Sequence, residues 1–370
     1  MATKVKRPRD FNYFLIFILF AISFLAKLKF NGLVYGLDFG LYHPDGSLYT
    51  FRTLTWLGHS QAEAGVKVSN WYLTHSFKSN QIDPSSLEFD KSPHWEVYRL
   101  RILYPALSVP FVALIGIPGM LVIPALSMLT LLICTYVISK ELGAPRLGLV
   151  LVTFFSFSIT ISRWMYVNTA DSLLVALTCL SVIAIMNFSR NNKAFLALIV
   201  LSLLSSATRF SLFILIAIAI SIAWQKFFYH SALLVTVAII GFLPHLFVNY
   251  APAVLASQSQ LSIPEKIIRF PHSIIRVGFY EIAQLAVLDR YLLVFLLLAS
   301  ILSVLNRSSY SARVFFLALT SLWLTGALNG VIGVNFRYQL PLLPFAVLVI
   351  VNHKEILGRF FQGQNLKEER

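Results

Sequence analysis

The chain has 370 residues, of which 57% are hydrophobic and only 12% are charged. Soluble domains usually carry about 25% charged residues, so this composition excludes an ordinary soluble domain and indicates a protein that crosses a membrane many times. A net charge of +14 would suggest a nucleic-acid partner in a soluble protein, but here the basic residues lie mostly in short loops between apolar runs. Lysine and arginine in such loops set membrane topology, and we expect no nucleic-acid partner.

The first apolar run covers residues 11–29 and follows the basic segment MATKVKRPRD. It lacks a small-residue cleavage site and is followed by the basic KLKF, so we interpret it as a retained first span rather than a signal peptide. Further apolar runs predict spans at 119–139, 145–162, 168–188, 193–207, 208–225, 230–250, 289–305, 312–328 and 337–352. The pattern predicts an all-α integral membrane protein, a bundle of about ten transmembrane helices in one domain, 1–370. Segment 102–117 is shorter and contains prolines, and we expect it to insert only partly.

The distribution of lysine and arginine predicts the orientation. With the N-terminus inside, ten spans place about 15 basic residues in short cytoplasmic segments and about 15 in much longer exterior ones. This asymmetry follows the positive-inside rule and places both termini in the cytoplasm. A full span at 102–117 would reverse it.

Two exterior segments, 31–101 and 251–288, are too long to be simple connectors. Within the first, residues 47–66 and 69–78 have the aromatic, amphipathic character of short helices at a membrane interface. No internal repeat is evident, which weighs against inverted-repeat transporters.

Four short patterns carry a resemblance to the GT-C superfamily of membrane glycosyltransferases. They are PDGSLYTF in the first exterior segment, YRLRILYPALSV at its end, RWMYVNTADSLLVAL at the start of a span, and NFRYQLPLLPFAVL near the C-terminus. The order and sidedness of these patterns resemble those of mannosyltransferase-like members of the superfamily. The resemblance implies a polyprenyl-phosphate-linked sugar as donor, a glycan, lipid or protein hydroxyl as acceptor, and inversion at the anomeric carbon. It also implies a bacterial-type plasma membrane location.

The resemblance assigns the catalytic base to Asp45, in PDGSLYTF, with Asp38 as the rival. A carboxylate held at the membrane surface can accept the proton of an acceptor hydroxyl. The structural alternative is that His-Pro-Asp-Gly is turn chemistry and that Asp45 stabilises the start of a helix.

Three residues are predicted to bind the donor phosphate: Arg337, Tyr338 and Arg209. A guanidinium matches phosphate oxygens well, and Arg209 interrupts a long apolar run, where a charge is costly. The alternatives are an arginine that reaches for the interface at Arg337 and a tight exterior turn at Arg209.

Arg101, Arg99, Glu96 and Asp171 are predicted to support the site, although structural pairing of the arginines and helix capping by Asp171 or Thr169 are the simpler readings. The four histidines of segment 31–101 show no metal-ligand spacing, and no glycine-rich phosphate loop occurs. We therefore expect no cofactor, with a divalent metal at Asp38 or Asp45 as the alternative. The competing functions are a transporter or flippase of a lipid-linked or small solute and a non-catalytic membrane scaffold subunit.

Overall fold

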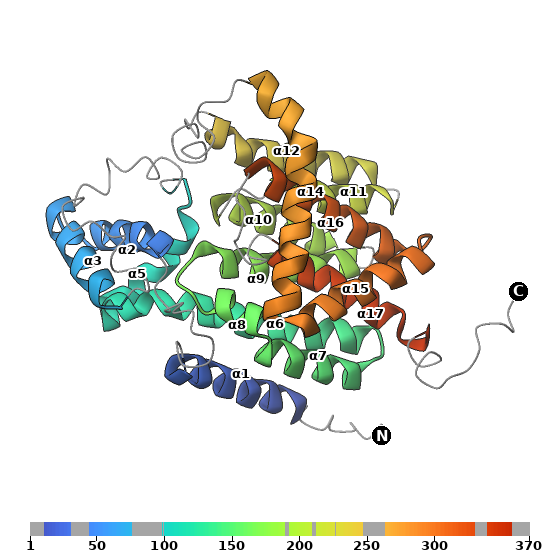
Figure 1. Ribbon diagram of the computed structural model, residues 1–370, viewed down its shortest axis with the longest axis horizontal. Coiled ribbons are helices and arrows are strands. Elements are labelled where there is room, and N and C mark those ends of the chain that lie inside the picture. The colour runs from blue at the N-terminus through green and yellow to red at the C-terminus, as the bar shows by residue number, and fades with distance from the viewer. Residues whose placement is uncertain are drawn as a thin grey trace, which may run out of the picture.

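The computed structural model describes residues 11–30, 44–75, 98, 100–188, 192–208, 212–225, 227–246, 263–329 and 339–356. In these ranges the chain forms helices joined by turns, without a strand, which confirms the predicted all-α class (Figure 1). The elements are α1 (Phe11–Phe30), α2 (Pro44–Trp56), α3 (Gln61–His75), α5 (Leu103–Ile115), η3 (Ile117–Leu121), α6 (Val122–Glu141), α7 (Pro145–Phe157), α8 (Ile159–Met165), α9 (Ala170–Asn187), α10 (Asn192–Thr208), α11 (Leu212–Ala223), α12 (Phe228–Leu246), α14 (Ile263–Leu288), α15 (Arg290–Leu305), α16 (Tyr310–Asn329), η5 (Leu340–Leu342) and α17 (Leu343–Asn352).

Membrane character is supported by three helical stretches among the described residues that are long and apolar enough to cross a bilayer: Phe11–Leu28, Ile117–Glu141 and Ala170–Asn187. A fourth arises if α7 and α8, which are bent by 70°, count as one span. Other apolar helices, such as Arg290–Leu305, fall short of the roughly 20 residues that a span needs. The bundle of about ten spans therefore stays a prediction.

Helices α1, α6 and α9 define two ends of the bundle. At one end α1 finishes, and α6 and α9 begin; we call it the site end. We call the other end the opposite end. At the opposite end, Asn12 donates to the Tyr136 hydroxyl at 2.6 Å, and the Lys354 ammonium donates to the Leu142 carbonyl at 2.7 Å. Figure 1 shows the site end on the left, where α2, α3 and α5 lie, and the opposite end on the right.

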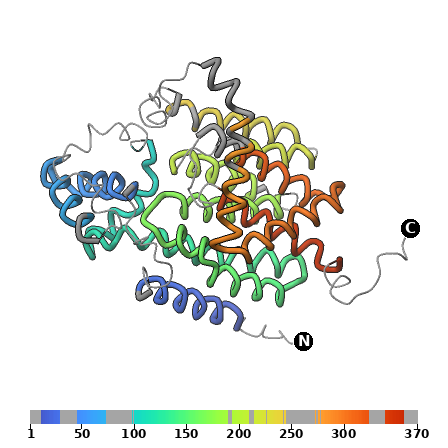
Figure 2. Tube along the Cα trace, viewed as in Figure 1, coloured from blue at the N-terminus to red at the C-terminus, as the bar shows by residue number. Residues whose placement is uncertain are grey.

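The bundle is organised around α9, most of whose side chains are buried. A helix that is apolar around its whole circumference belongs in the centre of a bundle, and α9 contacts α6, α10 and α17. The main hydrophobic cluster draws residues from α1, α6, α7, α9 and the C-terminal helices, whereas a smaller cluster joins α2, α3 and α5 to the start of α9. Figure 2 shows the blue and teal trace of this smaller unit beside the main bundle.

The aromatic helices predicted at 47–66 and 69–78 exist, but their boundary was wrong. Helix α2 ends at Trp56, Gly58 follows with a φ of 93°, and α3 runs from Gln61 to His75 across the predicted gap. Ser60 and Glu63 form a reciprocal capping box, in which the Ser60 amide donates to the Glu63 carboxylate at 3.0 Å and the Glu63 amide donates to Ser60 Oγ at 3.3 Å. The sequence pattern Ser-x-x-Glu was the signal for this start, and the hydrogen bonds from Ser60 lower the pKa of Glu63.

Segment 102–117 is largely the helix α5, and the chain then turns back sharply. With 13 residues, α5 is about 20 Å long, less than the roughly 30 Å of a bilayer core. Gly116 has a φ of 72°, and a side chain at Gly119 would collide with the backbone of Phe111. The two glycines therefore allow the close return from α5 through η3 into α6.

The span predicted at 145–162 is broken rather than continuous. The break falls at Ser158, whose backbone is extended, and Asp289 fixes it from a distant part of the chain. The Asp289 carboxylate accepts hydrogen bonds from Ser158 Oγ, from the Thr160 amide at 3.1 Å and from the Leu292 amide at 3.1 Å, so it joins the starts of α8 and α15. The sequence of 145–162 alone does not predict this break, because the residue that bonds to Ser158 lies 131 residues away in the chain.

Helix α14, from the second predicted exterior segment, crosses the other helices in Figure 1 and packs on α15 and α16. Its described outward side chains include Ile275 and Phe279, which are 70% and 75% exposed, whereas Glu281 is buried. His272 and Arg276 are exposed on the same helix, and this mixture of large apolar and basic side chains is typical of a helix at a membrane interface.

Candidate functional site

The candidate site lies at the site end, where α2, α3 and α5 meet the first turn of α9. Its walls are tyrosines: Tyr49, Tyr72 and Tyr104 are almost completely buried. The Tyr49 ring stands edge-on to those of Tyr98 and Tyr104, with centroid distances of 4.9 and 5.1 Å. Tyrosine brings a rigid apolar body and a polar hydroxyl, so this small core has hydrogen-bonding groups within it.

Asn168 lies in the loop before α9 and connects this loop to α2 and α3. Its side chain is fully buried and donates through Nδ2 to the Tyr72 hydroxyl. Thr50 Oγ1 lies 3.0 Å from the same hydroxyl and donates to the Gly46 carbonyl at 2.9 Å. Buried polar groups are costly unless they are hydrogen-bonded, and such networks fix a single arrangement of the elements that they connect.

Gly46 is required by this network. A Cβ at that position would overlap the side-chain amide of Asn168. The first turn of α2 thus lies directly against Asn168, three residues before Asp171 in the sequence.

Two predicted acids lie close in sequence to residues of this network. Asp45 lies in the first turn of α2 next to Gly46, and Asp171 lies in the first turn of α9. Asp45 is half-buried and Asp171 is buried. The partial positive charge of a helix N-terminus attracts a carboxylate in the first turn.

The predicted capping of α9 is wrong in its detail. Thr169 is the N-cap residue, but its side chain makes no capping hydrogen bond, and Asp171 lies inside the first turn. The residue before Thr169, Asn168, bonds to Tyr72 of α3.

Arg101 lies behind the tyrosine wall. Its Nη1 donates to the Tyr49 hydroxyl at 3.1 Å, and its guanidinium lies 4.7 Å from the centroid of the Tyr98 ring. Nearby, Arg52 donates to the Tyr98 carbonyl at 3.2 Å. These contacts fit the structural reading of Arg101, which packs on tyrosines and orients Tyr49.

Several predicted site residues lie outside the described residues: Asp38, Glu96, Arg99, Arg209, Arg337 and Tyr338. The described chain resumes at Gln339, directly after Tyr338, and Gln339 is buried. Gln339 is the N-cap residue of η5, which packs against α9, the helix that carries Asp171.

The residues of the buried hydrogen-bond network were not among the predicted site residues. Asn168 is one of them, although a role is predicted only for its neighbours Thr169 and Asp171. Its signal was the polar run NTADS between two apolar segments. Tyr72 and Thr50 gave no signal, because their pairing depends on how α2 and α3 fold together.

Among the described residues, no group of three or more His, Cys, Asp or Glu side chains is placed to hold a metal ion. The alternative of a metal at Asp38 or Asp45 involves one residue outside the described ranges and stays a prediction. Comparison with protein-family models, curated proteins and solved structures finds no match to this chain.

Proposed function

We propose that the chain is an integral membrane glycosyltransferase, which moves a sugar from a polyprenyl-phosphate donor to an acceptor hydroxyl with inversion. One observation carries the proposal most: two carboxylates on helix N-termini, Asp45 and Asp171, flank a buried hydrogen-bond network at one end of an apolar bundle. Such a place offers a base at fixed position, beside a membrane that delivers a lipid donor.

In this reaction Asp45 accepts the proton of the acceptor hydroxyl. The acceptor oxygen then forms a bond to the anomeric carbon, while the bond from that carbon to the phosphate oxygen breaks and its electron pair leaves with the phosphate. Arg337 and Tyr338, with Arg209, hold the phosphate and offset its charge. Asp38 is the alternative base.

In the proposal, the negative charge of Asp171 contributes to the electrostatic potential at Asp45, and Arg101 positions Tyr49. Arg99 and Glu96 complete the end of the first exterior segment in the proposal. The reaction as written uses no cofactor.

The proposed topology has about ten spans, with both termini in the cytoplasm of a bacterial-type plasma membrane. The site end then faces the exterior, together with the segments 31–101 and 251–288. The proposal gains support from α1, α6 and α9, which run between the two ends, and from the basic residues Lys140 and Lys354 at the opposite end.

The test is donor turnover by the full chain in lipid nanodiscs, with polyprenyl-phosphate mannose, glucose and arabinose offered in turn. We expect one donor to be consumed and its product to have the inverted anomeric configuration. Asp45→Asn should reduce turnover by about 100-fold or more, whereas Glu63→Gln, a matched acid on the exposed side of α3, should leave it unchanged. Full turnover by Asp45→Asn, with loss in Asp38→Asn, would move the base to Asp38.

The runner-up is a transporter or flippase of a lipid-linked or small solute. The 70° break between α7 and α8 favours it, since discontinuous helices often line transport sites. Movement of a lipid-linked sugar across vesicles without any cleavage would establish this function in place of transfer. A scaffold subunit would show neither activity.

A further inference from the structure

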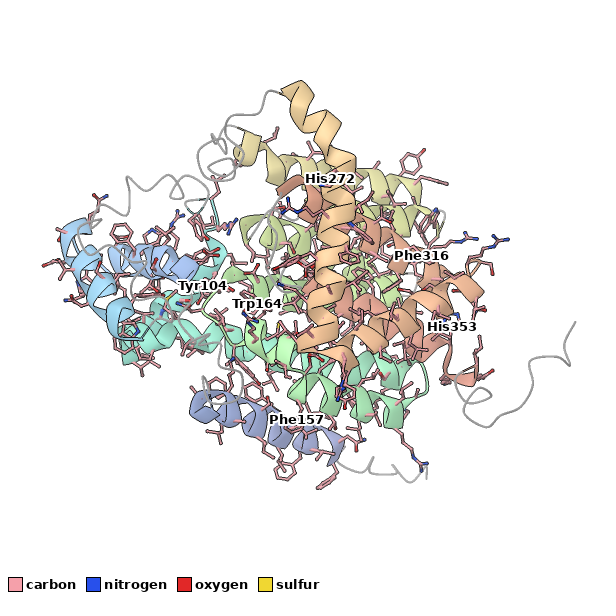
Figure 3. All side chains as sticks on the ribbon, in the orientation of Figure 1. Tyr104, Phe157, Trp164, His272, Phe316 and His353 are labelled. Atoms are coloured by element: carbon pink, nitrogen blue, oxygen red, sulfur yellow. The ribbon has the colours of Figure 1, made fainter. Side chains whose placement is uncertain are left out.

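Helix α8 is a short buried element between two longer helices. It has only seven residues, Ile159–Met165, and a helix of that length is not stable in isolation. Thr160, Ile161 and Trp164 are almost completely buried, and buried backbone amides are costly unless they are hydrogen-bonded. Figure 3 labels Trp164 on the side of the bundle toward α2 and α5. The position of α8 therefore depends on groups of other elements that bind its two ends.

Asp289 binds the start of α8. Its Oδ2 accepts hydrogen bonds from Ser158 Oγ at 2.5 Å and from the Thr160 amide at 3.1 Å. Its Oδ1 accepts from the Leu292 amide at 3.1 Å and so caps α15. Ser158 Oγ in turn accepts from the Ile161 amide at 3.3 Å. Each carboxylate oxygen therefore binds a different helix, Oδ2 the start of α8 and Oδ1 the start of α15.

The other end of α8 is bonded to two further parts of the chain. The Tyr166 hydroxyl shares a hydrogen bond with Ser23 Oγ of α1. Asn168 donates to the Tyr72 hydroxyl of α3 and lies against Gly46 of α2. The segment from the start of α8 to the start of α9 is thus bonded to three elements that are distant in the chain: α15, α1 and α3.

We infer that Asp289 is a positioning residue for the candidate site. By fixing the start of α8, it sets where Asn168 meets Tyr72, and thereby where the first turn of α2, which carries Asp45, lies. Asp289 acts through α8 and not on the reacting atoms. The expected loss of turnover rests on the proposed function, whereas the expected change in backbone protection does not.

Two variants disturb this anchor, and a third serves as the control. An amide has one acceptor oxygen, so Asp289→Asn cannot accept from both the Thr160 and the Leu292 amides. Ser158→Ala is milder, because it removes the Ser158 hydroxyl and leaves the cap of α15. The control is Ser309→Ala near the opposite end, where Ser309 Oγ accepts from the Ala312 amide at 3.3 Å at the start of α16.

Hydrogen exchange of the full chain in lipid nanodiscs tests the inference without any sugar. We expect Asp289→Asn to speed exchange about ten-fold in residues 159–169 and in residues 46–53 of α2. Ser158→Ala should show the same pattern at about three-fold, with α15 unchanged, and it decides alone if the Asp289→Asn chain does not fold. Ser309→Ala should affect only the start of α16. A change confined to α8, with α2 unaffected, overturns the inference.

Donor turnover supplies a second readout. Asp289→Asn should lower kcat about ten-fold and leave the donor KM within about two-fold, because α2 loses its position while the predicted phosphate ligands are unaltered. Combined with Asn168→Ala, it should add little to the loss caused by Asn168→Ala alone, since both changes act on one series of contacts. Losses that multiply would show that Asp289 acts independently of Asn168, and would overturn the inference.

The two readouts separate this inference from the proposed function. Coupled exchange in α8 and α2, without turnover of any donor, would keep the inference and lose the proposed function. Turnover by the wild type, with exchange in α2 unchanged in both anchor variants, would keep the proposed function and lose the inference.

Discussion

The two ends of the bundle treat polar groups differently. At the opposite end, Asn187 and Lys354 make hydrogen bonds near the surface, from half-buried side chains at or beyond helix ends. At the site end, Asn168, Thr50 and Asp171 are buried, and Asn168 and Thr50 lie within hydrogen-bond distance of the Tyr72 hydroxyl. A bundle can end its helices with exposed polar residues at little cost, whereas buried polar groups need full hydrogen bonding. Under the proposed function, the buried network of the site end also fixes the position of α2, which carries Asp45.

The largest expected effect is the difference between replacing Asn168 at the site end and replacing Asn187 at the opposite end. Asn168→Ala leaves the Tyr72 hydroxyl without its donor and should lower the free energy of unfolding by about 2–3 kcal/mol. It should also reduce donor turnover by roughly 100-fold, because α2 loses its fixed position. Asn187→Ala, which removes a partly buried amide at the opposite end, should cost about 0.5 kcal/mol and no turnover. Denaturant unfolding and turnover assays check both, and equal losses in the two variants would remove the contrast between the ends.

Two glycines offer a matched comparison of packing. A Cβ at Gly46 would overlap Asn168, and a Cβ at Gly148 would overlap Ser139 near the opposite end. Gly46→Ala and Gly148→Ala should each destabilise the protein by about 1–3 kcal/mol through overpacking. Only Gly46→Ala should also slow turnover, by about ten-fold. If Gly148→Ala reduced turnover as much as Gly46→Ala at the same stability, the loss of turnover would reflect general strain in the fold rather than a change at the site.

Tyrosine hydroxyls provide a smaller contrast. Tyr104 is fully buried and donates to the Met120 carbonyl at 2.7 Å, whereas the Tyr136 hydroxyl accepts from Asn12 in a partly buried bond. Tyr104→Phe leaves a buried carbonyl without its donor and should cost about 1–2 kcal/mol, and Tyr136→Phe should cost about 0.5 kcal/mol. Thermal unfolding of the two variants in the same detergent measures the difference, and the reverse order would contradict the burial argument.

The smallest effect concerns the capping box of α3. Because Ser60 lowers the pKa of Glu63 from its usual 4.5 in the folded chain, this interaction stabilises α3 above that pKa and is lost as pH falls through the lowered value. Ser60→Ala should speed hydrogen exchange in the first turn of α3 by about three-fold at neutral pH. The difference in exchange between variant and wild type, corrected for the intrinsic rate, should shrink as the pH falls below the lowered pKa of Glu63, to the part that the bond from the Glu63 amide to Ser60 Oγ supplies. A difference that does not shrink would show that the Glu63 carboxylate plays no part.

The sequence predicts the helical class and the helix positions well, because apolar runs are local properties of the chain. It also points to Asp45 and Asp171, since both acids stand at the edge of such runs. The sequence could not predict the break at Ser158, because it depends on Asp289, which is distant in the chain. It could not predict the partner of Asn168 either, because Tyr72 is also distant in the chain. The pattern of Ser60 and Glu63 predicts the start of α3 correctly. The aromatic pattern, on which the predicted boundary was based, does not.

Photo-crosslinking tests the location of the chemistry most directly. A polyprenyl-phosphate sugar with a diazirine near the phosphate would be irradiated with the full chain in nanodiscs, and the labelled peptides would be mapped. We predict labelling within Pro44–Trp56 or within residues 163–172, at the site end. Labelling confined to residues 136–146 or 352–356, at the opposite end, would contradict the assignment of the site.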